Sequence, residues 1–431
     1  MNPLAKELNS VLQGSVCYDL LSDFGKRFYF PKGIAAQSAE ANEHANRLNA
    51  TIGMAFANGQ PMMTKALRKH LQGLTPSEAV AYAPNAGDKA LRKVWKEEIL
   101  RKNPGVDSDC ISTPTVVSGL TNGIAQLADL FVDPGEPVVI PDMFWGNYRL
   151  IFEERKSAKI VPFPFFLPTG GLNVDGFGEA IRGSAENGSV VLVVNFPNNP
   201  TGYSPTIAEA EKLRNLLGRL AEEGLRIFVI IDDAYFGLFY EEDSYKQSLF
   251  ADLSSLHKNI LAAKIDGPTK EDFVWGFRLG FVTFGSRGMN KDQLKAMEQK
   301  LLGAIRSSIS NCSRSAQSLL LKVMLEPGYQ EEKDAFIGEL KDRYHAVREF
   351  LRAKGEHEVL KPLPFNSGYF MTFELKQGSS EELRTELLRG RGVGTIALKD
   401  KFLRVAYSQV ERSSISSLYE EVYKAAEKLV D

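Results

Sequence analysis

A lysine and an arginine lie eight positions apart in the loop-like stretch PTKEDFVWGFRLGF (268–281), which separates two apolar segments typical of buried strands. A partly desolvated lysine such as Lys270 can have a depressed pKa and attack a carbonyl carbon, which forms a Schiff base. An arginine such as Arg278 stays charged and holds a phosphate with its planar guanidinium group. The stretch therefore contains a candidate nucleophile and a candidate phosphate-binding group.

Two further loops offer polar groups of the kind that bind a small anionic ligand. SGLTNG (118–123) is a glycine-rich turn before a helical pattern, and a helix start of this kind presents N–H groups to a phosphate. An ordinary strand-to-helix turn explains that segment equally well when it is taken alone. NFPNNPTG (195–202) combines a rigid turn with the side-chain amides of Asn198 and Asn199, which a purely structural turn would not need.

An acidic loop, DDAYFG (232–237), follows the apolar run RIFVII. Asp232 therefore ends a buried strand, where a carboxylate is costly unless it is paired with a cation or a strong donor. We expect such a partner. The alternative is that Asp232 or Asp233 caps a following helix.

The elements that must position these loops alternate between short apolar runs and amphipathic helical patterns such as 208–224. Apolar strands separated by helices indicate a mostly parallel sheet covered on both faces. Ligands of such sheets bind beyond the carboxyl ends of the strands, so the loops should meet there. We expect an α/β fold with strands at 113–118, 136–141, 159–166, 189–195, 226–232, 259–265 and 279–285.

The ends of the chain differ from this pattern and predict a smaller α+β domain. The C-terminal part has a long helical pattern at 333–355 and strand-like segments at 368–375 and 402–410. We expect residues 1–62 to form an N-terminal arm and part of the small domain, residues 63–325 the large α/β domain, and residues 326–431 the remainder of the small domain.

The loops, in this order, resemble those of the fold type I pyridoxal phosphate enzymes, and specifically the class I/II aminotransferases. The resemblance spans about Tyr82 to Arg404, and its specificity comes from the ordered set of NNPTG, DDAY and the Lys270–Arg278 spacing. It implies the type I fold of pyridoxal-phosphate-dependent transferases, pyridoxal 5'-phosphate as cofactor and Lys270 as the Schiff-base lysine. It also implies that Arg278 holds the cofactor phosphate.

The resemblance assigns further residues to the cofactor ring. Asp232 would keep the pyridine nitrogen protonated, which makes the ring an electron sink. Tyr235 and Asn199 would bind the phenolic oxygen, and Trp145 in PDMFWGNY (141–148) would stack on the ring. Lys270, Asp232 and Tyr235 are thus the implied catalytic residues.

The remaining matches concern the phosphate, the substrate and the assembly. Gly119, Leu120 and Thr121 match the phosphate-cradling turn, and Tyr82 matches a tyrosine that reaches the phosphate of the neighbouring subunit, which implies a homodimer. Arg404, in FLRVAYS (402–408), matches the arginine that binds the substrate α-carboxylate, with Asn199 beside it.

One position departs from the family pattern. Three residues before the lysine the family usually has a serine that contacts the phosphate, and here the residue is Gly267. Thr269 could partly replace it. Lys264 is a weaker candidate for the Schiff base, since its distance from Arg278 does not match and it falls within a strand pattern.

Composition excludes several classes of protein. The 431 residues carry a net charge of -2, so no excess of basic charge indicates a nucleic acid or membrane partner. Three cysteines are too few for a disulfide framework and fit a reducing, cytoplasmic location. No run approaches the ~20 apolar residues of a membrane span. The five histidines lack metal-ligand spacing, so we expect no metal.

The expected activity is transfer of an amino group from an L-amino acid to a 2-oxo acid by a ping-pong mechanism. A lyase or decarboxylase on the same fold shares every cofactor residue named above and stays an alternative. A nicotinamide-dependent oxidoreductase lacks its fingerprint, because RGRGVG (389–394) follows a helix, as a helix C-cap and turn would, rather than a strand. A non-enzymatic sensor would need a fused DNA-binding domain. The sequence does not show which donor and acceptor are used.

Overall fold

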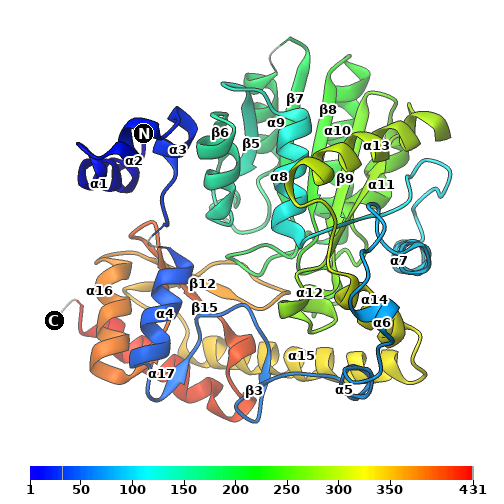
Figure 1. Cartoon of the computed structure of the whole chain (residues 1–431). Coiled ribbons are helices and arrows are strands. Elements are labelled where there is room, and N and C mark those ends of the chain that lie inside the picture. Colours follow the sequence, from blue (N-terminus) through cyan, green and yellow to red (C-terminus); the bar gives the residue numbers. More distant parts are fainter. Residues whose placement is uncertain (32, 186, 430–431) are drawn as a thin grey trace.

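A seven-stranded sheet forms the centre of the molecule in the computed structural model, which describes residues 1–31, 33–185 and 187–429 (Figure 1). All neighbouring strands in it are parallel except β10, which runs antiparallel to both of its neighbours. In spatial order the strands are β4 (Thr115–Val117), β10 (Gly280–Gly285), β9 (Ile260–Asp266), β8 (Arg226–Asp232), β7 (Ser189–Asn195), β5 (Pro137–Pro141) and β6 (Lys159–Phe163).

Both faces of this sheet are buried, because alternate residues of each strand pack into different cores. In β7, Val190, Leu192 and Val194 face a core shared with α9, α10 and α11, whereas Val191 and Val193 face a core shared with α8, η1 and α13. The covering helices are α8 (Leu120–Phe131), η1 (Arg149–Arg155), α9 (Val174–Ser184), α10 (Ile207–Glu222), α11 (Leu249–Leu256) and α13 (Lys291–Ser308). This arrangement explains why the strand sequences are continuously apolar.

Further helices lie at the end of the sheet that carries β4 and β10, or in the loops. Trp95 and Ile99 of α7 pack on Phe281 of β10 in a small separate core. These elements are α7 (Lys89–Lys102), α12 (Pro268–Glu271), η2 (Trp275–Phe277) and α14 (Arg314–Met324).

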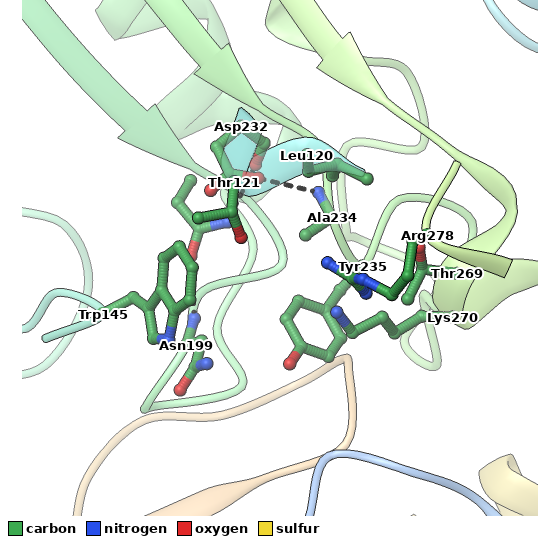
Figure 2. Close-up of a pocket in the computed structure, with 11 residues that line it drawn as sticks. Leu120, Thr121, Trp145, Asn199, Asp232, Ala234, Tyr235, Thr269, Lys270 and Arg278 are labelled. Atoms are coloured by element: carbon green, nitrogen blue, oxygen red, sulfur yellow. Dashed lines mark hydrogen bonds between the residues drawn. The ribbon is translucent and has the colours of Figure 1, made fainter. Parts of the chain in front are cut away.

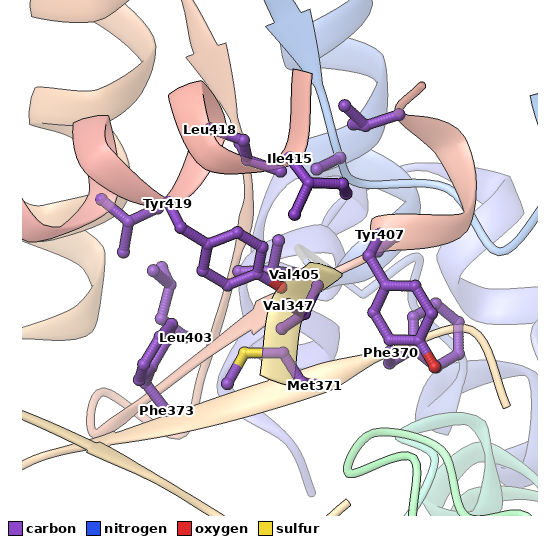
Figure 3. Close-up of a cluster of buried hydrophobic side chains, with 14 of the residues drawn as sticks. Val347, Phe370, Met371, Phe373, Leu403, Val405, Tyr407, Ile415, Leu418 and Tyr419 are labelled. Carbon is purple, nitrogen blue, oxygen red and sulfur yellow. The ribbon is translucent and has the colours of Figure 1, made fainter. Parts of the chain in front are cut away.

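A second, smaller sheet is antiparallel and has the strand order β11-β12-β15-β14. Its apolar core joins Met371 and Phe373 of β12 and Leu403 of β15 to Tyr419 of α17 (Figure 3). Its elements are α15 (Tyr329–Lys354), β11 (Leu360–Pro362), β12 (Met371–Leu375), α16 (Ser380–Thr385), η3 (Glu386–Gly390), β13 (Val393–Gly394), β14 (Ile396–Leu398), β15 (Phe402–Val405), η4 (Tyr407–Gln409), η5 (Arg412–Ser414) and α17 (Ile415–Glu427).

The N-terminal segment contacts both parts of the molecule: α3 packs beside η1 of the large domain and α5 and α6 pack on α14, whereas the stretch from α4 to β3 joins the small sheet (Figure 1). β1 pairs in parallel with β13, and Ala50, Ala55 and Met62 belong to the core of the small sheet. The segment comprises α1 (Pro3–Leu12), α2 (Val16–Leu20), α3 (Asp23–Arg27), α4 (Ile34–His44), β1 (Leu48–Asn49), β2 (Phe56–Ala57), β3 (Gln60–Pro61), α5 (Lys65–His70) and α6 (Pro76–Ala79). These contacts favour the predicted division at residues 62 and 325, which stays a prediction.

The predicted fold class is confirmed, with helices on both faces of a mainly parallel sheet. β7 and β8 have the predicted bounds, and the segment 389–394 is the end of a helical turn followed by the short strand β13, as its sequence indicated. In the part of the chain that the structure describes, none of the helices combines the length and the apolar composition of a membrane span.

Candidate active site

A cavity of about 190 Å³ lies at the carboxyl edge of the large sheet (Figure 2). It brings together residues from five loops that are far apart in the chain. The residues that line it are Leu120, Thr121, Trp145, Asn195, Asn199, Asp232, Ala234, Tyr235, Thr269, Lys270 and Arg278. Eight of these are predicted site residues, namely Leu120, Thr121, Trp145, Asn199, Asp232, Tyr235, Lys270 and Arg278.

Sheet topology explains why Lys270 and Arg278 meet. β9 ends at Asp266 at the carboxyl edge, and the antiparallel β10 begins at Gly280 at the same edge, where Phe281 pairs with Asp266. The connection between them therefore stays at the cavity. In Figure 2, Lys270 and Arg278 lie on one side of the cavity and Trp145 lies on the opposite side.

Lys270 has the properties of a nucleophilic amine. Its Nζ lies 5.0 Å from the ring centroid of Tyr235. The pKa of Lys270 is lowered to about 8, chiefly by burial; the charge of Asp232 opposes this effect and that of Arg278 adds to it. About a tenth of the amine is therefore uncharged at pH 7, far more than for an ordinary lysine.

Asp232 ends β8 and is 4% exposed. The Tyr148 hydroxyl donates to its Oδ2 at 2.6 Å, and the Ala234 N–H donates to its Oδ1 at 3.1 Å. Burial raises the pKa of Asp232, while the hydrogen bond from Tyr148 and the charge of Lys270 lower it. The expected partner of Asp232 is therefore the Tyr148 hydroxyl together with the Ala234 N–H group.

Arg404 lies on β15, does not itself line the cavity and is 1% exposed. Its Nη1 donates to Oδ1 of Asn199 at 3.1 Å, and its Nη2 donates to the carbonyl of Thr51 at 2.7 Å. Its Nε has no hydrogen-bond partner among the residues that the structure describes. Burial lowers the pKa of Arg404 to about 10, so the guanidinium stays charged at neutral pH.

The turn before α8 forms an anion cradle. Gly119 is the N-cap of this 12-residue helix, has φ +80° and gives the helix no side-chain cap. A Cβ added there would lie 2.7 Å from Nη2 of Arg278, so only glycine lets the guanidinium approach the turn. The free N–H groups at the start of α8 and the Arg278 guanidinium thus lie close together.

Gly267 cannot be replaced by the usual serine without movement of its neighbours. A Cβ at this position would lie 2.9 Å from the Leu279 carbonyl oxygen and 3.0 Å from Cα of Gly280. Both contacts are with backbone atoms, so a serine here would require the backbone at Leu279 and Gly280 to move. Thr269, in contrast, is 4% exposed and lines the cavity.

Lys264, the weaker candidate for the nucleophile, does not line the cavity. It is fully buried in β9, where its amine contacts Oδ2 of Asp233 and lies 3.2 Å from Oδ2 of Asp266. These carboxylates outweigh the effect of burial and raise the pKa of Lys264. Asp233 also accepts a hydrogen bond from the Ser248 hydroxyl at 2.6 Å, so it belongs to this cluster and does not cap a helix.

Tyr82 does not line the cavity of its own chain and is 92% exposed. Sequence reasoning missed Tyr148, the Thr51 carbonyl and Tyr369, whose hydroxyl donates to the carbonyl of Lys270 at 2.9 Å. The position of Tyr148, three residues after Trp145 in a loop beyond a strand, was an available signal for the first of these.

Comparison with known proteins places this geometry in a family. The sequence pattern of the family described as Aminotransferase class I and II matches residues 50–422. The chain belongs to this family. It is an aminotransferase that moves an amino group from an L-amino acid to a 2-oxo acid.

Curated relatives of this aminotransferase are distant. An aspartate/prephenate aminotransferase of Thermus thermophilus is 26% identical over 350 residues, which covers 80% of this chain and 82% of that protein. An aspartate aminotransferase of Pyrococcus horikoshii is 21% identical over 385 residues, which covers 88% and 92% of the two chains.

Solved structures agree in fold. An aminotransferase of Anaerococcus prevotii superposes with a TM-score of 0.83 at 23% identity, over 94% of this chain and 99% of that one. A Pyrococcus horikoshii kynurenine aminotransferase in complex with PMP gives a TM-score of 0.80 at 16% identity, over 97% and 99%. At these identities the structures support the fold and do not identify the substrate.

Proposed function

We propose that this aminotransferase uses pyridoxal 5'-phosphate, held covalently by Lys270. The observation that carries the proposal is the placement of Lys270, with a pKa of about 8, in one cavity with Asp232 and Arg278. A low-pKa amine suits imine formation, an acid suits a pyridine nitrogen, and a guanidinium suits a phosphate.

The donor set of the cavity fits this cofactor. The uncapped start of α8, the Arg278 guanidinium and the Thr121 side chain could hold the phosphate, and Thr269 could take the place of the missing serine. Tyr235 and Asn199 would bind the phenolic oxygen. Trp145 would stack on the ring, because it lies across the cavity from Lys270 (Figure 2).

Each residue then has a defined task in the reaction. When bound, the cofactor supplies an electron-poor ring that makes the Cα proton of the amino acid removable. Asp232 would hold a proton on the ring nitrogen and so favour that electron-poor state. Lys270 would take the Cα proton of the amino acid with its Nζ and return a proton.

Arg404 would bind the substrate α-carboxylate with the help of Asn199. Asn199 and the Thr51 carbonyl fix the position of the Arg404 guanidinium. Its Nε, which has no partner among the described residues, is free to donate to a carboxylate. Arg404→Ala should weaken amino-acid binding by about 2 kcal/mol or more, since a charge-assisted contact is lost. Loss of cofactor binding in this variant would place Arg404 in the cofactor site or the fold instead.

We infer a homodimer in which Tyr82 reaches the partner's phosphate, and the high exposure of Tyr82 in the single chain supports this. Mixing subunits tests it. Tyr82→Ala and Lys270→Ala proteins, each weakly active, should regain up to about a quarter of wild-type activity when refolded together, because hybrid dimers contain one complete site. No recovery would show that Tyr82 acts within its own chain or not at all.

The three cysteines, Cys17, Cys110 and Cys312, are free, which supports the proposed cytoplasmic location. Fractionation of cells that express the chain at its native level would test this inference.

Peptide mapping tests the cofactor and the lysine together. Borohydride reduction of the protein with pyridoxal phosphate should fix one label per chain on Lys270. A label on Lys264, or no label, would overturn the proposal.

A single-turnover experiment separates the aminotransferase from a lyase. With one amino donor and no acceptor, we expect one equivalent of 2-oxo acid per site and stoichiometric pyridoxamine phosphate. Continuous release of ammonia would indicate a lyase instead. Repeating the assay with acidic and aromatic donors, aspartate included, would define the substrate class.

A further inference from the structure

The two residues that follow Lys270 are buried carboxylates with no direct place in the cavity. Glu271 is 8% exposed and Asp272 is 5% exposed, and neither lines the cavity. Two adjacent buried acids are costly unless cations compensate them. The turn that carries the proposed nucleophile therefore depends on whatever pairs with these two side chains.

Lys333 pairs with both acids. Its Nζ lies 3.0 Å from Oε1 of Glu271 and 2.8 Å from Oδ1 of Asp272, and the residue is only 3% exposed. The two carboxylates raise the pKa of Lys333 even though burial opposes this, so the amine is charged. One side chain thus bridges both residues after Lys270.

Two further groups complete the cluster. Lys102 of α7 lies 2.9 Å from Oε1 of Glu271, and the Tyr329 hydroxyl donates to Oδ1 of Asp272 at 2.5 Å. Lys102 also lies 3.5 Å from Oε2 of Glu98. Tyr329 and Lys333 both lie in the first turns of α15.

The other side of Lys270 is held as well. The Tyr369 hydroxyl donates to the Lys270 carbonyl at 2.9 Å. Glu271 also packs against the loop of Tyr235, since a Cβ at Gly237 would lie 2.6 Å from Oε1 of Glu271. The Lys270 backbone is therefore fixed from two directions, although α12 has only four residues and gives little rigidity of its own.

α15 carries this connection to the small sheet. Its later residues Leu340, Tyr344 and Val347 belong to the core that contains β12 and β15, and β15 bears Arg404. Figure 1 shows α15 running from the region of α12 along the small sheet. The helix thus joins the turn of Lys270 to the element that carries the proposed substrate clamp.

We propose that Lys333 is a positioning residue for the amino-transfer reaction, which holds the Lys270 turn through Glu271 and Asp272. The inference rests on the proposed role of Lys270. Lys333 touches neither cofactor nor substrate, and it acts by keeping the Lys270 amine at one position in the cavity. A displacement of about 1 Å at such a group can cost about a hundredfold in rate.

The first experiment compares Lys333→Met with wild-type enzyme loaded with pyridoxal phosphate. We expect kcat to fall at least tenfold while KM for the amino donor stays within about threefold, because the change displaces Lys270 and leaves Arg404 in place. Tyr329→Phe removes one donor to Asp272 and keeps the ring, so it should give a smaller change in the same direction. This second variant keeps the test valid if Lys333→Met does not fold.

The second experiment measures Lys270 itself in the cofactor-free protein. The pH profile of its acetylation, followed by mass spectrometry, should have a midpoint near 8 in the wild type. The charged groups around the amine are Asp232 and Arg278, with Tyr235 beside it. In Lys333→Met the midpoint should rise toward 10.5, since a loosened turn exposes the amine to water and the two acids lose a cation.

Arg384→Met is the matched control. Arg384 is 6% exposed and pairs with Glu40 and Glu381, and it lies on α16 away from the cavity. Arg384→Met should lower the free energy of unfolding without changing kcat or the pH midpoint of Lys270 acetylation. If Lys333→Met behaves like this control, Lys333 is only structural and the proposal is wrong. Failure of the proposed function would appear differently, as a borohydride label outside Lys270 in the wild-type protein.

Discussion

The Tyr148 hydroxyl donates a 2.6 Å hydrogen bond to Oδ2 of Asp232, an acid that is 4% exposed. Burial raises the pKa of Asp232, and this hydrogen bond is the strongest effect that opposes the rise. The charge of Asp232, and with it the proposed proton on the cofactor nitrogen, thus depends on a residue 84 positions earlier in the chain.

Tyr148→Phe should therefore reduce kcat by roughly 10- to 100-fold, which corresponds to about 1.5–3 kcal/mol for a hydrogen bond to a charged group. Steady-state kinetics would measure the loss. Tyr203→Phe is a suitable control, because Tyr203 donates a similar bond to Glu209 outside the cavity. Equal kinetic effects of the two changes would contradict a special role for Tyr148.

The buried cluster of Lys264, Asp233 and Asp266 makes a prediction about stability. Lys264→Met leaves two buried carboxylates without their cation, and breaking such a pair costs about 3–5 kcal/mol in the free energy of unfolding. Urea unfolding of the cofactor-free protein would measure this.

Lys291→Met removes an exposed ion pair with Asp109 and should have no measurable effect on unfolding. A Lys264→Met protein as stable as wild type would mean that Asp233 takes up a proton at little cost. Burial raises the pKa of Asp233 to about 6 even though Lys264 lowers it, so loss of Lys264 would raise that pKa further and favour the protonated acid.

The strands were predictable because both of their faces are buried. SVVLVVN and RIFVIID are apolar at every position but their ends, and β7 and β8 match them residue for residue. The lining of the cavity was predictable for a different reason, since parallel strands bring their following loops to one edge of the sheet.

Side chains that act across the fold were not predictable. The position of Tyr148 in a loop beyond a strand indicates a place near the site but not its partner, and the helical pattern around Lys333 indicates only a polar face; their partners lie 84 and 61 positions away. No local spacing rule links such residues, because tertiary packing alone brings them together. The absence of a serine at position 267 was visible in the sequence, but its steric reason required the backbone of β10.

The depressed pKa of Lys270 predicts a pH dependence of folding. Between pH 8 and about 10.5 the unfolded lysine holds a proton that the folded one has lost, so the free energy of unfolding should rise with pH in this window. The slope is at most about 1.4 kcal/mol per pH unit. Denaturant titrations of the cofactor-free protein and of Lys270→Met, compared at each pH, would isolate this contribution. A difference that does not vary with pH would show an ordinary lysine pKa.

Gly267→Ser would restore the family's usual residue, and we expect it to harm this enzyme. Its Cβ would meet the Leu279 carbonyl oxygen at 2.9 Å and Cα of Gly280 at 3.0 Å, so the backbone between β9 and β10 must shift. Overpacking of this kind costs about 1–3 kcal/mol, and a shift here also moves the loop between Lys270 and Arg278. The Kd for pyridoxal phosphate should therefore rise about tenfold or more, as measured by equilibrium dialysis.

Gly276→Ser is the control in the same loop, because a Cβ there meets nothing within 4 Å, and its Kd for pyridoxal phosphate should not change. Tighter cofactor binding by Gly267→Ser would show that the strands adjust and that the serine hydroxyl outweighs the steric cost.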